Sequence, residues 1–157
     1  MYYMEQRMDI RSTPENSDTV VAHCIAADLN WGSGVAPVIN RDWLNAENLC
    51  RYTSSTNPDG VKSKLHVGEI LAVKPEGHQI TLVNLITKAL SSYKPTYESL
   101  TESLMTLKKY MEINGLTTLY MPKIACGIDM LSWDVVNQII KGVFYNTNIK
   151  ITIAVRD

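Results

Sequence analysis

The chain has 157 residues, enough for one domain that buries a core of its own. An apolar content of 45% and a charged content of 20% are typical of soluble globular proteins, and a net charge of −1 argues against a domain dominated by nonspecific binding to nucleic acid backbones. No apolar run approaches the roughly 18 residues that a membrane-spanning helix needs, and residues 1–11 lack the apolar core of a secretory signal.

The three cysteines indicate a reducing compartment. Cys24, Cys50 and Cys126 are odd in number, lie far apart and form no CxxC pair of the kind that holds zinc. The three histidines share no metal-ligand spacing either. We therefore expect one cytoplasmic, monomeric domain over residues 1–157, with reduced thiols, no metal, no cofactor and no membrane association.

The chain opens with short apolar runs separated by polar segments. Residues 19–26 (TVVAHCIA) are β-branched and apolar, which predicts a central strand with His23 as a hydrogen-bonded core histidine. A weak helical pattern follows over 35–43. Residues 51–65 are polar and contain the turn signal NPDG, which predicts a surface loop.

A hairpin is expected next. The apolar runs near 66–74 and 79–87 flank the sequence KPEGH, and together they predict two antiparallel strands. Pro75 and Gly77 suit positions i+1 and i+3 of a type I turn between them. Lys88 then stands at the end of the second run, although lysine is rarely buried without a partner.

The second half of the chain alternates helices and strands. Thr96 is a candidate N-cap for an amphipathic helix that ends near Gly115. Its expected core face repeats at spacings of three and four: Tyr97, Leu100, Leu104, Leu107 and Met111.

A strand is expected at 117–121, and Ser132 can then cap a last helix before a closing strand at 149–155. The core face expected for this helix is Val135, Val136, Ile139, Ile140, Val143 and Phe144. Because strands interleave with helices here, we predict an α/β fold with three layers (α/β/α) and a mixed central sheet.

Two loops share one form, in which glycine and small residues stand between a strand and a helix. They are Gly32-Ser33-Gly34 and Ala125-Cys126-Gly127. Such loops let backbone N–H groups converge on an anion, although glycines after strands more often form plain turns. Two of them at one sheet edge would suit a diphosphate, because open α/β sheets bind ligands beyond the carboxyl ends of their strands. Neither loop fits a Walker loop or a dinucleotide GxGxxG.

Three side chains have both a structural and a chemical interpretation. Cys126 resembles a nucleophile, but a small buried space-filler is favoured because no activating histidine is near in sequence. Asp129 can support a turn or act in proton transfer. Lys88 can be a strand-end lysine that reaches water, or an amine activated by the desolvation that a buried position provides.

Four segments together resemble the macrodomain family: AHCIAADLNWGSGVA, LITKALSSYKPTYESL, MPKIACGIDMLSW and the ending NIKITIAV. Within that family they are similar to the terminal ADP-ribose protein glycohydrolase branch, which includes antitoxin macrodomains that remove ADP-ribose from DNA. The resemblance runs from about Asp9 to Val155. Ala125 stands where the family often has glycine.

The resemblance implies a role for each matched position. Asp9 and Ile10 would meet the adenine of ADP-ribose. Lys88 would attack the anomeric carbon of the distal ribose, and Asp129 would assist proton transfer and resolve the adduct. The residues that would wrap the diphosphate and distal ribose are Gly32, Ser33, Gly34, Val35, Ala125, Cys126, Gly127 and Ile128.

The resemblance therefore implies a hydrolase that binds ADP-ribose and removes it from modified protein, nucleic acid or a small ester. An ADP-ribose-1″-phosphate phosphatase and a non-catalytic ADP-ribose reader are the alternatives. The presence of both Lys88 and Asp129 favours the hydrolase, because a reader needs neither an amine nor a proton shuttle.

Overall fold

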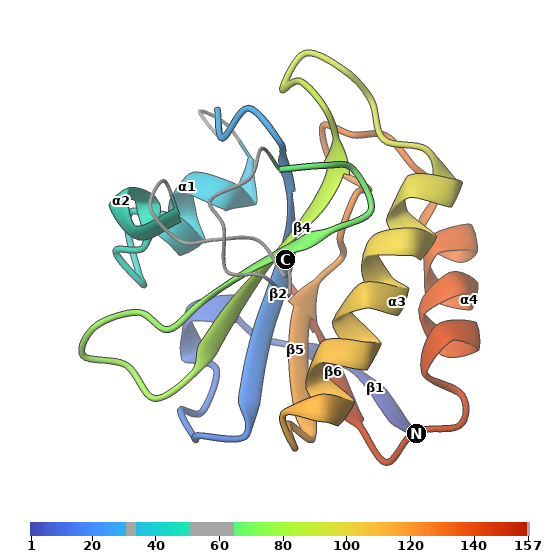
Figure 1. Ribbon diagram of the computed structural model, residues 1–157. Helices are drawn as coiled ribbons and strands as arrows, with labels where there is room; N and C mark the ends of the chain where they lie inside the picture. Colours follow the sequence, from blue (N-terminus) through green and yellow to red (C-terminus); the bar gives the residue numbers. More distant parts are fainter. Residues whose placement is uncertain (31–33, 51–64, 157) are drawn as a thin grey trace.

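The computed structural model describes residues 1–30, 34–50 and 65–156 (Figure 1). Six strands of the described chain form one sheet in the order β1-β6-β5-β2-β4-β3. Neighbouring strands run parallel except for the antiparallel pair β3 and β4, so the predicted mixed sheet is confirmed. The strands are β1 (Tyr2–Arg7), β2 (Thr19–Ala26), β3 (Ile70–Val73), β4 (Thr81–Lys88), β5 (Thr118–Pro122) and β6 (Lys150–Val155).

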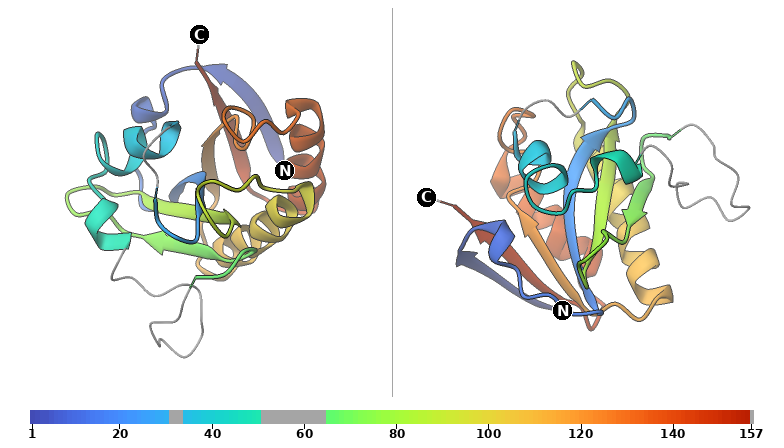
Figure 2. Two further views of the ribbon diagram at one scale, coloured as in Figure 1. Left: turned by 90° about the horizontal axis from the view of Figure 1, so that it is seen from above. Right: turned by 90° about the vertical axis from the view of Figure 1, so that its left-hand side faces the viewer.

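Helices cover both faces of this sheet, which confirms the three layers (Figures 1 and 2). One face carries α3 (Tyr97–Ile113) and α4 (Trp133–Phe144), and the other carries α1 (Val35–Asn40) and α2 (Glu47–Cys50). A short 3-10 helix, η1 (Ile10–Ser12), follows β1. None of the helices in the described ranges combines the length and the apolar character that crossing a membrane requires.

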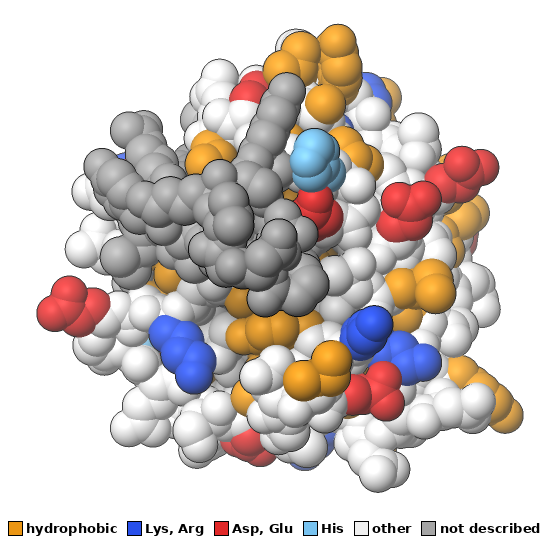
Figure 3. All heavy atoms as spheres, in the orientation of Figure 1, with side chains coloured by type: hydrophobic (Ala, Val, Ile, Leu, Met, Phe, Trp, Pro, Cys, Tyr) orange, Lys and Arg blue, Asp and Glu red, His pale blue; other side chains and the backbone are white. Residues whose placement is uncertain are grey.

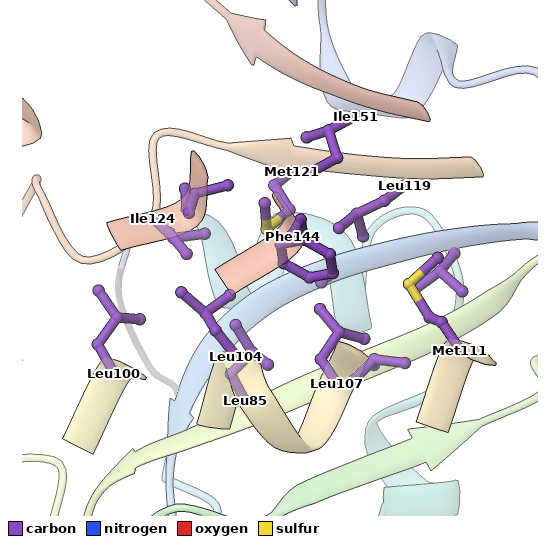
Figure 4. Packing of buried hydrophobic residues seen from close by; sticks show 14 of the residues in the cluster. Leu85, Leu100, Leu104, Leu107, Met111, Leu119, Met121, Ile124, Phe144 and Ile151 are labelled. Carbon is purple, nitrogen blue, oxygen red and sulfur yellow. The ribbon is translucent and has the colours of Figure 1, made fainter. Parts of the chain in front are cut away.

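The core beneath α3 and α4 follows the apolar periodicity of the sequence. Leu100, Leu104 and Leu107 of α3 are fully buried and face Phe144 of α4 (Figure 4). Thr96 caps α3 as predicted, because its hydroxyl accepts a hydrogen bond from the Ser99 backbone N–H at 3.0 Å.

Two residues assigned to the helical core faces lie outside the core. Tyr97 is 37% exposed and Val135 is 42% exposed. Both are in the first turn of their helices, and the Tyr97 hydroxyl accepts a hydrogen bond from the Ser132 backbone N–H. Periodicity alone cannot show that the first turn of a helix extends beyond the sheet that it covers.

The predicted hairpin is confirmed, but its turn differs from the prediction. The His78 backbone N–H donates to the Pro75 carbonyl, so Pro75 occupies position i and Gly77 occupies position i+2. Gly77 has φ +81°, which a type I turn does not contain and which favours glycine at i+2 of a type II turn.

The first strand was not predicted, because β1 lies at the edge of the sheet and most of its residues are exposed. It has no alternating pattern to identify it, and its partner β6 is at the other end of the chain. The helix expected over 35–43 ends at Asn40. Of the loop expected over 51–65, residues 51–64 lie outside the described ranges.

His23 is a hydrogen-bonded core histidine, as predicted. It is 0% exposed, and its Nε2 lies 2.7 Å from Asn84 Oδ1 on β4 and 3.0 Å from Asn40 Nδ2 at the end of α1. Burial lowers the pKa of the imidazole to about 4, and the contact with Asn84 opposes this shift only in part. The ring is therefore neutral in the folded protein at pH 7.

This burial predicts a loss of stability in mild acid. The unfolded chain protonates His23 near its ordinary pKa of about 6.5, whereas the folded chain does not, so acidification from pH 7 to pH 5 should lower the free energy of unfolding by about 2 kcal/mol through this group. Urea denaturation of the wild type and His23→Gln at both pH values measures it. Equal pH dependence in the two proteins would contradict the assignment.

Candidate active site

A cavity of about 230 Å³ opens where β2, β4 and β5 end. These strands are parallel, so their carboxyl ends meet at one edge of the sheet, where ligands of open α/β sheets bind. The segments that line the cavity come from the ends of the strands and from the three loops that follow them: 24–26, 30, 34–36, 88, 91, 122–125 and 127–129.

Lys88 is placed by a bulge at the end of β4. Ile25 lies opposite Ile86 and Ala26 lies opposite Lys88, so Thr87 is an extra residue on β4. Such a bulge interrupts the alternation of side chains along a strand and can redirect the residue that follows. The Ala27 backbone N–H donates to the Lys88 carbonyl at 2.9 Å, which fixes the strand end in this register.

Two serine hydroxyl groups of α3 hold the same end of β4 from the face of the sheet that α3 and α4 cover. The Ser103 hydroxyl donates to the Ile86 carbonyl at 2.8 Å, and the Ser99 hydroxyl donates to the Thr87 carbonyl at 2.7 Å. Both bonds are buried, where a hydrogen bond is expensive to leave unmade. The backbone before Lys88 is therefore anchored to a helix as well as to β2.

The Lys88 ammonium does not extend into water. Its Nζ donates to Asp129 Oδ1 at 2.7 Å, and the two side chains are only 12% and 15% exposed. The structure thus brings together the two residues to which the resemblance assigned the chemistry, from the end of β4 and from the loop after β5. Such an ion pair is costly to bury, and its retention at the floor of a cavity is typical of a functional site.

The loop between β5 and α4 holds Asp129 in a tightly folded segment. Ala125 and Met130, on either side of it, have φ values of +61° and +64°. A non-glycine residue in this left-handed backbone conformation loses roughly 1–2 kcal/mol of stability, and the conformation persists only where surrounding contacts enforce it. The Leu131 backbone N–H donates to the Ala125 carbonyl at 2.9 Å and closes the loop. Ala125 thus adopts a backbone conformation that glycine would adopt without strain.

The loop after β2 is attached to the loop after β4 through Asp28. One carboxylate oxygen accepts from the Asn30 backbone N–H and the other accepts from the Ser91 backbone N–H, both at 2.9 Å. Partial burial by itself would raise the pKa of Asp28, but these hydrogen bonds outweigh it and lower the pKa. Asp28 therefore stays ionised and joins two walls of the cavity.

Seven of the predicted site residues line the cavity: Lys88, Asp129, Gly34, Val35, Ala125, Gly127 and Ile128. Gly32 and Ser33 lie outside the described residues. Cys126 packs against the core beneath α3 and α4 instead, and burial raises the pKa of its thiol. The position of Cys126 agrees with the interpretation that this side chain fills space against the core.

Asp9 and Ile10 are not brought to the cavity that contains Lys88. Asp9 caps η1, and its carboxylate accepts hydrogen bonds from Nε and Nη2 of Arg11 at 3.0 and 2.8 Å. These hydrogen bonds from the Arg11 side chain hold the pKa of the Asp9 carboxyl well below its usual range. Ile10 is buried in the core between the sheet and α1.

The prediction missed several residues that line the cavity: Cys24, Ile25, Ala26, Asn30, Ala36, Ser91, Pro122, Lys123 and Ile124. Most of them are the last residues of β2 and β5 or directly follow these strands. The predicted ends of the strands were therefore the signal in the sequence that could have identified them. Burial and the nearby Asp129 carboxylate raise the pKa of the Cys24 thiol, which makes it a poor nucleophile. Among the described residues, no three of His, Cys, Asp and Glu are grouped as metal ligands would be.

Comparisons with known proteins agree with this fold. No protein-family model matches the chain. It is 37% identical over 133 residues to the human ADP-ribose glycohydrolase OARD1, covering 85% of this chain and 79% of the relative. The macrodomain of Mycobacterium tuberculosis DarG superposes with a TM-score of 0.80 at 12% identity, over 98% of this chain and 96% of that one. The structure of Thermosipho africanus DarTG in complex with ADP-ribose superposes with a TM-score of 0.81 at 15% identity, over 98% of this chain and 41% of that one.

A mixed six-stranded sheet between two helical layers, with its cavity at the strand ends, is the macrodomain fold, and the chain belongs to the macrodomain family. Within that family it is similar to the ADP-ribose glycohydrolase OARD1. The resemblance inferred from the four sequence segments is confirmed.

The positive φ of Gly34, +78°, makes this position sensitive to a side chain. Gly34→Ala should lower the free energy of unfolding by about 1–3 kcal/mol, because φ +78° with ψ −148° is a backbone conformation that residues with a Cβ rarely adopt. Among the described residues, the new Cβ would meet Ile128 Cδ1 at 3.6 Å, which is an ordinary contact. Gly142→Ala, in open space within α4, should instead raise the free energy of unfolding by about 0.5–1 kcal/mol. Urea denaturation measures both variants. No loss of stability in Gly34→Ala would contradict the strained conformation of Gly34.

Proposed function

We propose that the protein hydrolyses ADP-ribose from modified targets, with Lys88 as the nucleophile and Asp129 as the proton-transfer group. The observation that carries the proposal is the contact of 2.7 Å between Lys88 Nζ and Asp129 Oδ1 in the cavity. The glycohydrolase activity in the name of the human relative, and the ADP-ribose in the complex of the bacterial DarTG, support the same ligand.

The loops around the cavity suit the diphosphate and distal ribose. Gly34 and Gly127 line the same cavity as the ion pair, and the absence of a Cβ lets a ligand approach their backbone closely. The adenine would lie nearer η1, where Asp9 accepts hydrogen bonds from Arg11. A carboxylate has about four acceptor sites, so Asp9 can still accept from an exocyclic amine.

The ion pair provides a route for the protons of the reaction. When Lys88 gives a proton to Asp129, its amine attacks the anomeric carbon of the ribose, and the bond from that carbon to the leaving carboxylate breaks. Water then attacks the same carbon and the C–N bond breaks. Asp129 protonates the departing amine and accepts a proton from the water. ADP-ribose and a free carboxylate are released, Asp129 gives its last proton to the solvent, and both residues return to their initial states.

A non-catalytic reader does not account for the pair. A module that only binds would have to desolvate two opposite charges at the floor of its site without using either of them in a reaction. Backbone N–H groups of the loops would be sufficient to bind a diphosphate.

Replacement of the nucleophile tests the proposal directly. Lys88→Ala should reduce release of ADP-ribose from a glutamate-ADP-ribosylated protein by at least about 1,000-fold, because the covalent step is lost, while calorimetry still detects ADP-ribose binding. The matched control is Lys74→Ala, an exposed lysine that directly follows β3, which should retain full activity. Unchanged turnover in Lys88→Ala would rule out the lysine mechanism.

Replacement of the carboxylate should trap the intermediate. In Asp129→Ala, water can take the proton from Lys88, so its amine can still attack. Resolution of the adduct slows, so intact-mass analysis after incubation with substrate should show one ADP-ribosyl group on the protein. Peptide mapping should place it on Lys88, and the double variant with Lys88→Ala should remain unmodified. An adduct that persists in the double variant would contradict the assignment, as would phosphate release from ADP-ribose-1″-phosphate without any ester hydrolysis.

A further inference from the structure

The cavity has two lysines in its lining, Lys88 and Lys123, and their charges are in different situations. Lys88 is neutralised by Asp129, whose Oδ1 lies 2.7 Å from its Nζ. Lys123 is exposed and forms no ion pair with a carboxylate in the described part of the chain. The Cys24 thiol is neutral, because burial raises its pKa. The described lining therefore carries two positive charges and one negative charge, and the excess belongs to Lys123.

The position of Lys123 along the sheet edge is central. The strand order places the end of β5 between β6 and β2 (Figure 1), and Lys123 directly follows β5. Asp9 follows β1, on the β6 side of this point, and Lys88 ends β4, on the β2 side. A ligand whose adenine lies near Asp9 and whose distal ribose lies beside Lys88 passes the end of β5 with its middle. The middle of ADP-ribose is the diphosphate.

An aromatic ring holds the Lys123 ammonium without neutralising it. Its Nζ lies 5.6 Å from the ring centroid of Trp133, the first residue of α4. The Trp133 indole N–H donates to the Glu5 carboxylate on β1 at 2.8 Å, which fixes the ring. A cation over an aromatic face is attracted by the quadrupole of the ring but keeps its full charge. Lys123 is therefore held beside the cavity with a charge available to an anionic ligand.

The rest of the surface offers no general attraction for anions. The chain has a net charge of −1, and on the face drawn in Figure 3 the visible Lys and Arg side chains are scattered among acidic ones. Interactions between exposed charges are screened over about 10 Å at 0.1 M salt, so a cation at the cavity itself acts most strongly on a bound diphosphate. Backbone N–H groups of the loops supply hydrogen bonds to phosphate oxygens but no net charge.

We propose that Lys123 is a specificity-determining residue, whose ammonium binds the diphosphate of ADP-ribose and makes the cavity select a diphosphate ligand over an uncharged nucleoside. This inference rests on the proposed function, because it places the distal ribose beside Lys88. Lys123 takes no part in making or breaking a bond. Its contact with the diphosphate is equally strong before and during the reaction, so it acts on the affinity for the substrate and not on the rate of the bound complex.

The test compares two variants of Lys123 with a matched control. Lys123→Met removes the charge and keeps an unbranched side chain, whereas Lys123→Arg keeps the charge. The control is Lys150→Met, because Lys150 Nζ also lies over an aromatic ring, 5.7 Å from the centroid of Tyr2. Lys150 is the first residue of β6 and lies opposite Thr118, the first residue of β5, so it is at the sheet edge remote from the cavity.

Calorimetry at about 0.05 M salt should show that Lys123→Met binds ADP-ribose roughly five- to tenfold more weakly, and this difference should shrink at about 0.5 M salt. The affinity for adenosine, measured by ligand-observed NMR, should be unchanged because adenosine has no phosphate. Lys123→Arg should stay within about twofold of the wild type, and Lys150→Met should match it.

Three results would overturn the assignment. An equal loss of affinity for adenosine, or a loss that does not depend on salt, would mean that Lys123 only supports the loop after β5. A failure of Lys123→Arg to retain affinity would mean the same, since the charge is present in that variant. Unchanged ADP-ribose affinity in Lys123→Met would show that the backbone alone binds the diphosphate.

Turnover of a glutamate-ADP-ribosylated protein separates this inference from the proposed function. In Lys123→Met, KM should rise by about the same factor as the dissociation constant while kcat is unchanged. Release of ADP-ribose without any effect of Lys123 on affinity contradicts the role of Lys123 alone. Binding of ADP-ribose that depends on Lys123, without release from the modified protein, contradicts the hydrolase alone. A protein that does not bind ADP-ribose contradicts both.

Discussion

The parallel pairing of β2 with β4 on one side and with β5 on the other is the constraint on which the site depends. Because the three strands point the same way, their carboxyl ends and the loops that follow meet at one sheet edge. Lys88 and Asp129 are 41 positions apart in the chain, yet this arrangement brings their side chains to 2.7 Å. An antiparallel arrangement of β4 and β2 would place Lys88 at the opposite end of the sheet.

Around that edge, polar contacts keep the backbone in position and apolar contacts supply the stability. Asp28 connects the loops after β2 and β4, and Lys94 connects the loops after β4 and β5. Ser99 and Ser103 attach the end of β4 to α3, whose leucines form the main core. The cavity is therefore pre-formed, and the strained backbone at Ala125 is maintained by the fold around it. Pre-formed geometry of this kind favours chemistry that depends on a fixed distance between two side chains.

Local physical chemistry made much of the fold predictable. The Thr96 cap, the leucine spacing of α3 and the β-branched run of β2 each involve residues close in sequence, and each is confirmed. The sequence segments that carried the family resemblance also identified both residues of the ion pair, although residue type and position alone favoured Lys88 as a strand-end lysine exposed to water. Turn chemistry was less certain, because the register at Gly77 depends on where two strands pair.

The sequence by itself determined the long helices α3 and α4 and the central strands, because capping and apolar periodicity act over a few residues. Only the tertiary structure decided that β1 pairs with β6, that Tyr97 lies outside the core and that Asp9 does not line the cavity that contains Lys88. It also decided that Lys88 is shielded from water against Asp129. These outcomes depend on contacts between residues distant in the chain, and such contacts are fixed only when the sheet has assembled.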